Sequence, residues 1–223
     1  MKYIIFDSGP LINFSMNGLL DLLEKLKKEF KGKFLITQGV LQETINYPIN
    51  IKRFELEALK VKDLFDRGII ELPNLTKEQE AEFDRKTHEI MNTANSMFIA
   101  KKRAIHLIDN GEAASLALSS VLKEPNVIAV DERTTRMLTE SPENLRNLMQ
   151  KKLHTSIIPD KKKYDYFKNF RIIRSTELIY IAYKKHLIEL KDPRILDAML
   201  YGMKFHGCSV SFEEIEEIKR IAR

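Results

Sequence analysis

The sequence predicts an α/β fold in which a mostly parallel sheet is covered by helices on both faces. Short, apolar, β-rich runs alternate along the 223 residues with longer segments whose apolar residues recur at helical spacing. Hydrophobic residues make up 43% of the chain and charged residues 31%, which is typical of a globular protein with a substantial core. Strands that are apolar on both faces lie between two layers, the usual setting of a parallel sheet.

The first part of the chain already shows this alternation. The run YIIF at residues 3–6 predicts a strand, and leucines at helical spacing predict a helix over residues 19–30. The run KFLIT at residues 33–37 predicts a second strand. The helix that follows should stop near Tyr47, because Pro48 disfavours the helical conformation of the residue before it.

The remaining strands of the sheet are predicted from three further apolar runs, at residues 69–72, 126–130 and 170–174. The chain from about residue 50 to 105 is interpreted as a helical insertion in the core. Within the insertion, Thr76 and Gln79 have the spacing of a capping box, and the apolar residues that follow have helical spacing up to Phe98.

The end of the chain predicts a helical hairpin. Asp192 and Pro193 are interpreted as the N-cap and the first residue of one helix, and Gly207 as the residue just beyond its end. Ser211 and Glu214 form a capping box for the second helix. We therefore expect two units, a core that includes the insertion and a C-terminal helical extension packed on it, over residues 1–180 and 181–223.

Charge and motif content narrow the function classes. The chain has 37 Lys and Arg against 32 Asp and Glu, a net charge of +5, which permits a polyanionic partner without requiring one. Its one cysteine, Cys208, is expected to be a small buried residue, and without a signal region we expect a cytoplasmic protein that does not bind membranes. Zinc-site histidine pairs, CxxC, Walker A and GxGxxG motifs are absent from the sequence.

Four acidic residues stand near the edge where open parallel sheets bind their ligands, beyond the carboxyl ends of the strands. Asp7 directly follows YIIF, and Asp131 directly follows VIAV. Glu43 lies in the helix after residues 33–37, and Glu112 in the first turn of the helix that begins at GEA. Carboxylates that converge repel one another unless a cation neutralises them, and hard oxygen ligands suit Mg²⁺ or Mn²⁺.

Each of these acidic residues also has an explanation without function. Asp7 and Asp131 can be turn residues at strand ends, and Glu43 can lie on the solvated face of an amphipathic helix. Asp109 and Glu112 have the spacing of a capping box, and helix capping is the interpretation we prefer for Asp109. Spacing alone leaves these alternatives open for the four candidates.

Four segments, in this order, resemble PIN-domain proteins: FDSGPLINF at 6–14, LITQGVLQETI at 35–45, LIDNGEAASLALS at 107–119 and VIAVDERTTRML at 127–138. The resemblance is to the prokaryotic branch with a D-S/T-x-P-L-I opening, a V-x-x-E helix, a GEA helix and an acidic pair at a strand end. It covers about residues 1–140, and the final SVSFEEIEEIKRIA is similar to that branch's C-terminal helix.

The resemblance implies a PIN-like fold and a Mg²⁺- or Mn²⁺-dependent ribonuclease that hydrolyses phosphodiester bonds with a metal-activated water. It places the catalytic and metal-binding roles on four acids, Asp7, Glu43, Glu112 and Asp131. Ser8 and Glu132 would orient these ligands without contacting the metal ion. Arg133 and Arg136 follow on the next helix and are predicted to contact the substrate phosphate, with pairing to Glu132 as the alternative.

A basic segment is the second candidate for substrate binding. Lys161, Lys162 and Lys163 precede several aromatic residues and could bind single-stranded RNA; the alternative, which we favour, is a solvated loop whose aromatics pack beneath the last strand. Lys101, Lys102 and Arg103 form a further candidate patch, for which the interpretation we prefer is a charged surface without a binding role. The resemblance also implies an antitoxin protein or a homodimer as partner. The other functions left open are a PIN-fold module that binds RNA or protein without catalysis, and a DNA-directed, flap-type nuclease.

Overall fold

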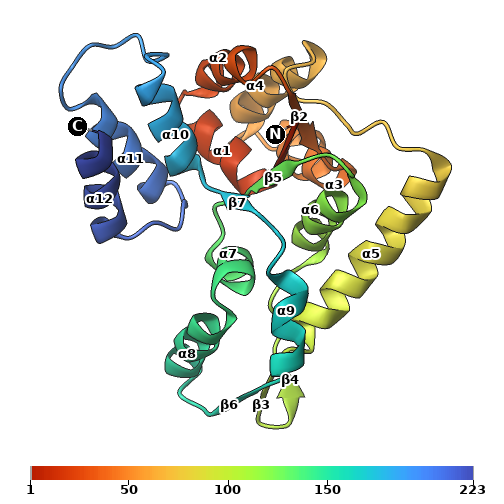
Figure 1. Ribbon diagram of the computed structural model, residues 1–223. Coiled ribbons are helices and arrows are strands. Elements are labelled where there is room, and N and C mark those ends of the chain that lie inside the picture. The colour runs from red at the N-terminus through yellow and green to blue at the C-terminus, as the bar shows by residue number, and fades with distance from the viewer. Residues whose placement is uncertain (1, 223) are drawn as a thin grey trace.

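A four-stranded parallel sheet flanked by helices forms the centre of the protein (Figure 1). The computed structural model describes residues 2–222. The strands lie in the order β2-β1-β5-β7, and their bounds are Lys33–Ile36, Tyr3–Phe6, Asn126–Ala129 and Ile172–Ile173. All three pairings are parallel. The α/β class predicted from the alternating runs is therefore confirmed.

Helices occupy most of the rest of the described chain. Before β3 they are α1 (Ser8–Met16), α2 (Leu20–Phe30), α3 (Gln38–Leu41), a π-helical turn (Gln42–Asn46), a 3-10 turn (Pro48–Asn50), α4 (Glu55–Asp66) and α5 (Lys77–Asn95). After β4 they are α6 (Asn110–Val121), α7 (Arg133–Glu140), α8 (Pro142–Leu153), a 3-10 turn (Lys161–Lys163), α9 (Tyr164–Phe167), α10 (Ser175–Lys184), α11 (Ile195–Phe205) and α12 (Phe212–Ala222).

A second, antiparallel sheet corrects the helical interpretation of the insertion. It has the order β4-β3-β6, with bounds Arg103–Ala104, Phe98–Ala100 and Ile157–Pro159. The prediction of helix up to Phe98 was wrong, because α5 ends at Asn95 and Phe98 pairs across to Pro159 on β6. That partner lies some 60 residues away along the chain, and local periodicity does not register such pairing.

Two other expectations were wrong in detail. The apolar run at 69–72 forms no full strand; it contributes a single bridge, between Leu35 and Glu71. Asp192 does not cap a helix that begins at Pro193, because α11 begins at Ile195. The Asp192 carboxylate instead accepts a hydrogen bond from the backbone N–H of Arg194 within a turn. Each error concerns a boundary where a turn competes with regular structure.

The predicted caps are otherwise present. Reciprocal capping-box hydrogen bonds join Thr76 with Gln79, Asp109 with Glu112, and Ser211 with Glu214. Gly207 follows the end of α11 with φ of 118°, a conformation that glycine adopts without strain. The helix after β2 ends at the predicted place before Pro48, although its last turn, Gln42–Asn46, has π-helical hydrogen bonding.

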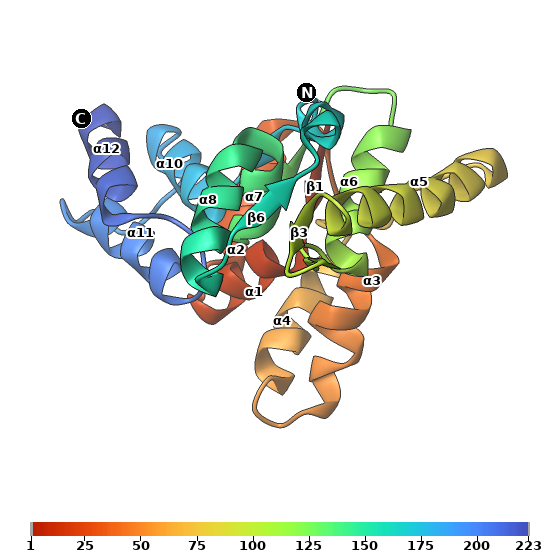
Figure 2. The ribbon, with the colours of Figure 1, turned by 90° about the horizontal axis from the view of Figure 1, so that it is seen from below.

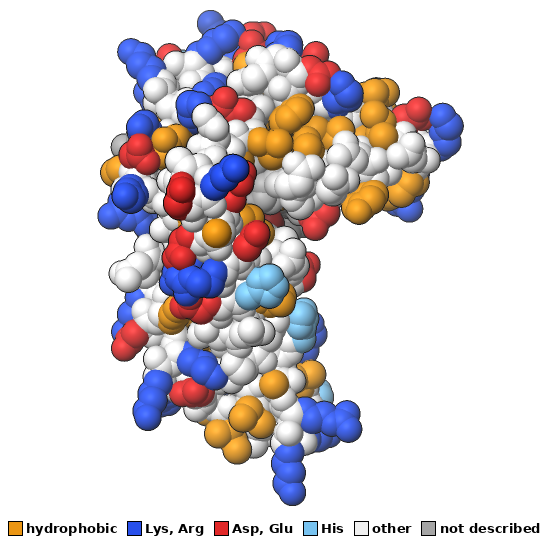
Figure 3. Space-filling model, turned by 90° about the vertical axis from the view of Figure 1, so that its right-hand side faces the viewer, with side chains coloured by type: hydrophobic (Ala, Val, Ile, Leu, Met, Phe, Trp, Pro, Cys, Tyr) orange, Lys and Arg blue, Asp and Glu red, His pale blue; other side chains and the backbone are white. Residues whose placement is uncertain are grey.

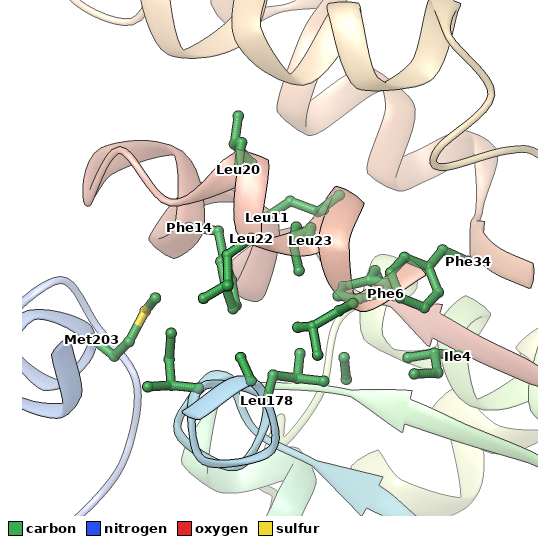
Figure 4. Close-up of a cluster of buried hydrophobic side chains, with 14 of the residues drawn as sticks. Ile4, Phe6, Leu11, Phe14, Leu20, Leu22, Leu23, Phe34, Leu178 and Met203 are labelled. Carbon is green, nitrogen blue, oxygen red and sulfur yellow. The ribbon is translucent and has the colours of Figure 1, made fainter. Parts of the chain in front are cut away.

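The sheet separates two hydrophobic clusters, because successive strand residues point to opposite faces. Ile4 and Phe6 of β1 belong to one cluster and Ile5 to the other. Figure 4 shows the first cluster, in which Phe6 and Phe34 pack with ring centroids 5.0 Å apart. Residues of α11 and of the connection to α12 join the same cluster, among them Leu200, Met203 and Cys208.

The C-terminal helices therefore share the core of the sheet. Helices α11 and α12 lie beside α10 on one side of the molecule, and the long helix α5 extends on the opposite side (Figures 1 and 2). Cys208 is 3% exposed, as expected for a small buried residue, and burial raises the pKa of its thiol well above its usual range. Among residues 2–222, no helix is both long and apolar enough to cross a bilayer.

Candidate functional site: an acidic cavity

Three helices begin at the carboxyl edge of the parallel sheet, and each begins at an acidic residue. Asp7 is the N-cap of α1, Asp109 of α6 and Glu132 of α7. Strands β1 and β5 end immediately before the first and last of these turns. Helix N-termini carry partial positive charge from their unpaired N–H groups, so this edge favours carboxylates and bound anions such as phosphate.

These residues line one cavity of about 320 Å³. Its lining comprises Asp7, Ser8, Gly9, Ile12, Asn13, Glu43, Asp109, Glu112, Asp131, Glu132, His206 and Gly207. The structure thus brings together all four acids that the sequence singled out, together with Ser8 and Glu132. The lining contains six carboxyl groups and one basic side chain, so this open cavity carries an excess of acidic groups.

Asp7 is buried at the cavity, but unlike Asp131 it has no short hydrogen bond from another side chain. Its side chain is 6% exposed, and its closest side-chain donor is the hydroxyl of Ser115, 3.4 Å from Oδ1. Burial raises the pKa of Asp7 to about 7, the neighbouring carboxylate of Glu112 adds to the rise, and the backbone N–H of Ser8 opposes it. A nearby cation would strongly stabilise the ionised form of such a buried carboxyl group.

Glu112 combines two roles, as helix cap and as cavity residue. Its Oε2 accepts a hydrogen bond of 2.9 Å from the backbone N–H of Asp109, and its Oε1 accepts one of 2.6 Å from the hydroxyl of Thr135. Burial nevertheless raises the pKa of Glu112 to about 7, and those two hydrogen bonds only partly oppose the rise. The capping interpretation is confirmed for Glu112, and capping has not removed it from the cavity.

Glu43 reaches the cavity from the π-helical turn after α3. Single π turns often occur at functional sites, because the wider turn redirects a side chain. The carboxylate lies against the start of α6: a Cβ added to Gly111 would lie 3.1 Å from Glu43 Oε1 and 3.4 Å from Asp109 Oδ1. The absence of a side chain at Gly111 therefore allows these two carboxylates to approach the helix.

This close approach gives a first prediction. Gly111→Ala should weaken binding of Mn²⁺ at this cavity by up to about tenfold, because the added methyl group displaces the Glu43 carboxylate. Stability of the metal-free protein should change little, since the displaced group is the end of a flexible side chain. Titration with Mn²⁺ and thermal unfolding of the same preparation test both parts. Gly39→Ala, where the added Cβ meets only the Thr37 hydroxyl at 3.7 Å, is the matched control.

Asp131 differs from the other acids because its carboxylate is fully engaged by the protein. Oδ1 accepts a hydrogen bond of 2.8 Å from the backbone N–H of Ser175; Oδ2 accepts one of 2.6 Å from the Ser175 hydroxyl and one of 2.5 Å from Asn13 Nδ2. The residue is 2% exposed, and its backbone carbonyl accepts from Ser209 N–H. Asp131 therefore ties α1, α10 and the α11–α12 connection to the end of β5.

The positively charged candidates lie elsewhere. Neither Arg133 nor Arg136 belongs to the described lining of the cavity. Arg133 Nε donates a 2.9 Å hydrogen bond to the hydroxyl of Ser209, and Arg136 forms ion pairs of 3.4 Å with Glu140 and Glu214. The alternative pairing of Arg136 with Glu132 is also absent from the described chain, because the Glu132 carboxylate caps α7 at Thr135 N–H.

The basic segment forms a 3-10 turn beside the second sheet, outside the cavity. Lys161 and Lys162 are exposed, whereas Lys163 donates to the carbonyl of Ser96. The aromatics that follow pack as the favoured alternative expected. Phe167 is fully buried, and the hydroxyls of the two neighbouring tyrosines donate to Glu143 and Glu89.

Sequence reasoning missed the wall of the cavity that the C-terminal helices provide. His206 and Gly207 line the cavity from the end of α11. His206 Nδ1 lies 3.0 Å from the carbonyl oxygen of Gly202 and 3.0 Å from Oδ1 of Asn17, two acceptors that place the proton on Nδ1. Nothing in the spacing of the histidines signals this, because the contact joins residues at opposite ends of the chain.

The donor chemistry of the cavity fits a hard divalent cation. Asp7 and Glu112 have raised pKa values and Glu43 lies nearby, so a cation bound between them would relieve their mutual repulsion. The side chains surround the space; they do not gather on one point. Within residues 2–222, no three Asp, Glu, His or Cys side chains are grouped as a ready-made metal site.

No protein-family model matches the sequence, and no curated protein matches it either.

Proposed function

We propose that the protein is a divalent-metal-dependent ribonuclease that hydrolyses phosphodiester bonds. The single observation that carries the proposal is the acidic cavity at the carboxyl edge of the sheet, where two carboxyl groups have pKa values of about 7. The choice of RNA rests on the four sequence segments that resemble PIN-domain proteins. Those segments supply Asp7, Glu43, Glu112 and Asp131 to the same cavity.

Asp7, Glu43 and Glu112 would hold the metal ion in this proposal. Bound there, Mg²⁺ or Mn²⁺ would lower the pKa of a water ligand and offset the charge that develops on the phosphate. Because Asp7 and Glu112 both have pKa values of about 7, a large share of each is protonated below neutral pH. Ion uptake there would release protons, and the apparent affinity should rise as the pH approaches 8.

The other residues of the cavity orient these groups. Asp131 holds Asn13 and Ser175 through three hydrogen bonds, so it fixes the edge of the sheet against α1 and α10. The N-termini of α1, α6 and α7 offer partial positive charge to the phosphate. His206 is the only basic side chain of the described lining, and its Nε2 makes no hydrogen bond within the described residues.

The proposal is tested with labelled RNA and DNA of identical sequence, each incubated with Mg²⁺, Mn²⁺ or a chelator. We expect RNA fragments only when a metal ion is present. Binding of RNA that depends steeply on salt, without cleavage in Mn²⁺, would instead identify a binding module. Cleavage of DNA but not RNA would identify a flap-type nuclease. Thermal unfolding with and without Mn²⁺ reports ion binding independently of activity.

A further inference from the structure

The second sheet places two distant basic stretches side by side. β3 pairs with β6 in antiparallel register, with Ala100 opposite Ile157. The turn that follows β3 therefore lies next to the connection between α8 and β6. Figure 1 shows this sheet at the lower end of the molecule, away from the parallel sheet, and Figure 3 shows Lys and Arg side chains gathered with hydrophobic ones at that end.

Both stretches lack acidic residues. There is no Asp or Glu between residues 97 and 108, nor between residues 144 and 159. Five cations of these stretches are exposed and form no ion pair within the part of the chain that the structure describes: Lys101, Lys102, Arg103, Lys151 and Lys152. We call these five residues the basic tip. Nearby cations are neutralised, Arg146 by Glu143 and Lys163 by Asp160.

The turn between β3 and β4 has lysines at positions where the backbone conformation is unfavourable for them. Lys101 and Lys102 have φ of 48° and 64°, so both adopt the left-handed conformation of a two-residue hairpin turn. Asn and Gly are strongly preferred at such positions, and each lysine there costs about 1 kcal/mol. Local folding therefore does not account for two lysines at this turn.

Apolar side chains lie between the cations. Ile99 and Ile158 are directly opposite each other on neighbouring strands and are 39% and 67% exposed. An exposed apolar strip bordered by unpaired cations fits a chain that offers phosphates at regular intervals and flat, weakly polar bases between them. Single-stranded RNA has this chemistry, and it is the substrate class of the proposed function.

The tip is close enough to the acidic cavity for one RNA strand to contact both. Asp109 is only six positions after Arg103 in the chain, so the two lie within about 20 Å of each other. The connecting segment is fixed, because Asn95 Oδ1 accepts hydrogen bonds from the N–H groups of Leu107 and Ile108. At about 3.4 Å per nucleotide in a stacked strand, this span corresponds to about six nucleotides.

We propose that the basic tip binds the phosphate backbone of the RNA strand whose scissile bond lies in the acidic cavity. This inference rests on the proposed function for the identity of the strand. It gives the enzyme a second contact with substrate, outside the cavity. An RNA too short to span the two sites is bound through the cavity alone.

The test replaces four lysines of the tip by glutamine, Lys101→Gln, Lys102→Gln, Lys151→Gln and Lys152→Gln together. The matched control carries Lys31→Gln, Lys60→Gln, Lys77→Gln and Lys191→Gln. These lysines are also exposed, form no ion pair in the described chain and change the net charge by the same amount. Binding of a polyuridine of roughly 20 nucleotides is measured with a chelator present, from about 50 to 200 mM salt.

We expect the tip variant to bind polyuridine at least tenfold more weakly than the control variant. The slope of log affinity against log salt should fall by up to about 3, since each phosphate contact to a single strand contributes about 0.7. Cleavage of a trinucleotide should be unchanged, whereas KM for long RNA should rise. Equal affinities and slopes for the two variants would overturn the inference.

Two further outcomes separate this inference from others. If the wild-type protein cleaves no RNA but the difference in binding persists, the basic tip binds RNA as inferred and the proposed nuclease function fails. If the tip variant loses binding to vesicles of anionic lipid but keeps its affinity for polyuridine, the tip binds membranes and the inference is wrong.

Discussion

Asp7→Asn should lower the proposed metal-dependent cleavage by at least about a thousandfold, and at the same time stabilise the metal-free protein at pH 8. The proposed activity is lost because Asp7 is one of the three residues proposed to hold the metal ion. The stability gain follows from the pKa of Asp7, which burial raises from 3.8 to about 7. The unfolded chain ionises this carboxyl more readily than the folded one, so wild-type stability falls as pH rises from about 4 to 7 and stays reduced above that.

The size of the gain follows from the same shift. A difference of about 3 pKa units corresponds to at most about 4 kcal/mol, and coupling to Glu112 will reduce what one substitution recovers. Chemical unfolding of both proteins with a chelator, at pH 4 and pH 8, measures it. The two proteins should differ at pH 8 and agree at pH 4. Added Mn²⁺ should stabilise the wild type and leave Asp7→Asn almost unchanged. Retained cleavage, or a loss of stability at pH 8, would contradict the assignment of Asp7.

Asp131→Asn should have the opposite effect on stability. Its carboxylate accepts three hydrogen bonds, and an amide in its place would direct an NH₂ group at donors on Ser175 or Asn13. Mispairing of a buried, charge-assisted network costs about 2–4 kcal/mol, which lowers the melting temperature by roughly 5–10 °C in a chain of this size. Thermal unfolding with a chelator present measures the effect without any contribution from bound metal.

A double-mutant cycle isolates the network. Ser175→Ala alone should destabilise the protein. In the Asp131→Asn background the same substitution should lower the stability much less, because the carboxylate that accepts the Ser175 hydrogen bonds has already been replaced. If Asp131→Asn keeps full stability and loses only the Mn²⁺-induced stabilisation, Asp131 is a metal ligand and does not act as a structural tie. The two aspartates at the strand ends are thus distinguished by the sign of the stability change on substitution by Asn in the metal-free protein.

The strands at residues 3–6, 33–37 and 126–130 were predictable because each is a short apolar run buried on both faces. The pairing of Phe98 with Pro159 was not, since β3 and β6 are defined by a partner far along the chain. Local sequence patterns reveal helix caps such as Thr76 and Ser211, because a cap and its partner lie three residues apart. They do not reveal a sheet whose strands are only two or three residues long.

The same distinction applies to the site. The gathering of Asp7 and Asp131 was predictable from the rule that carboxyl ends of parallel strands meet at one edge. The rule does not reveal which carboxylate faces the cavity and which is held by hydrogen bonds from the protein. That difference depends on Ser175, a residue outside the four segments that resemble PIN-domain proteins. His206 was equally beyond reach, because its place depends on how α11 packs against Asn17.

The contact between Ser209 N–H and the carbonyl of Asp131 has a consequence for how the protein matures. The lining of the acidic cavity runs from Asp7 to Gly207, so it is complete only after the segment that follows α11 has packed against the sheet. Contacts of such long sequence separation slow folding, because the entropy of loop closure is lost before they form. During synthesis the chain would carry its carboxylates early but complete the lining of the cavity last.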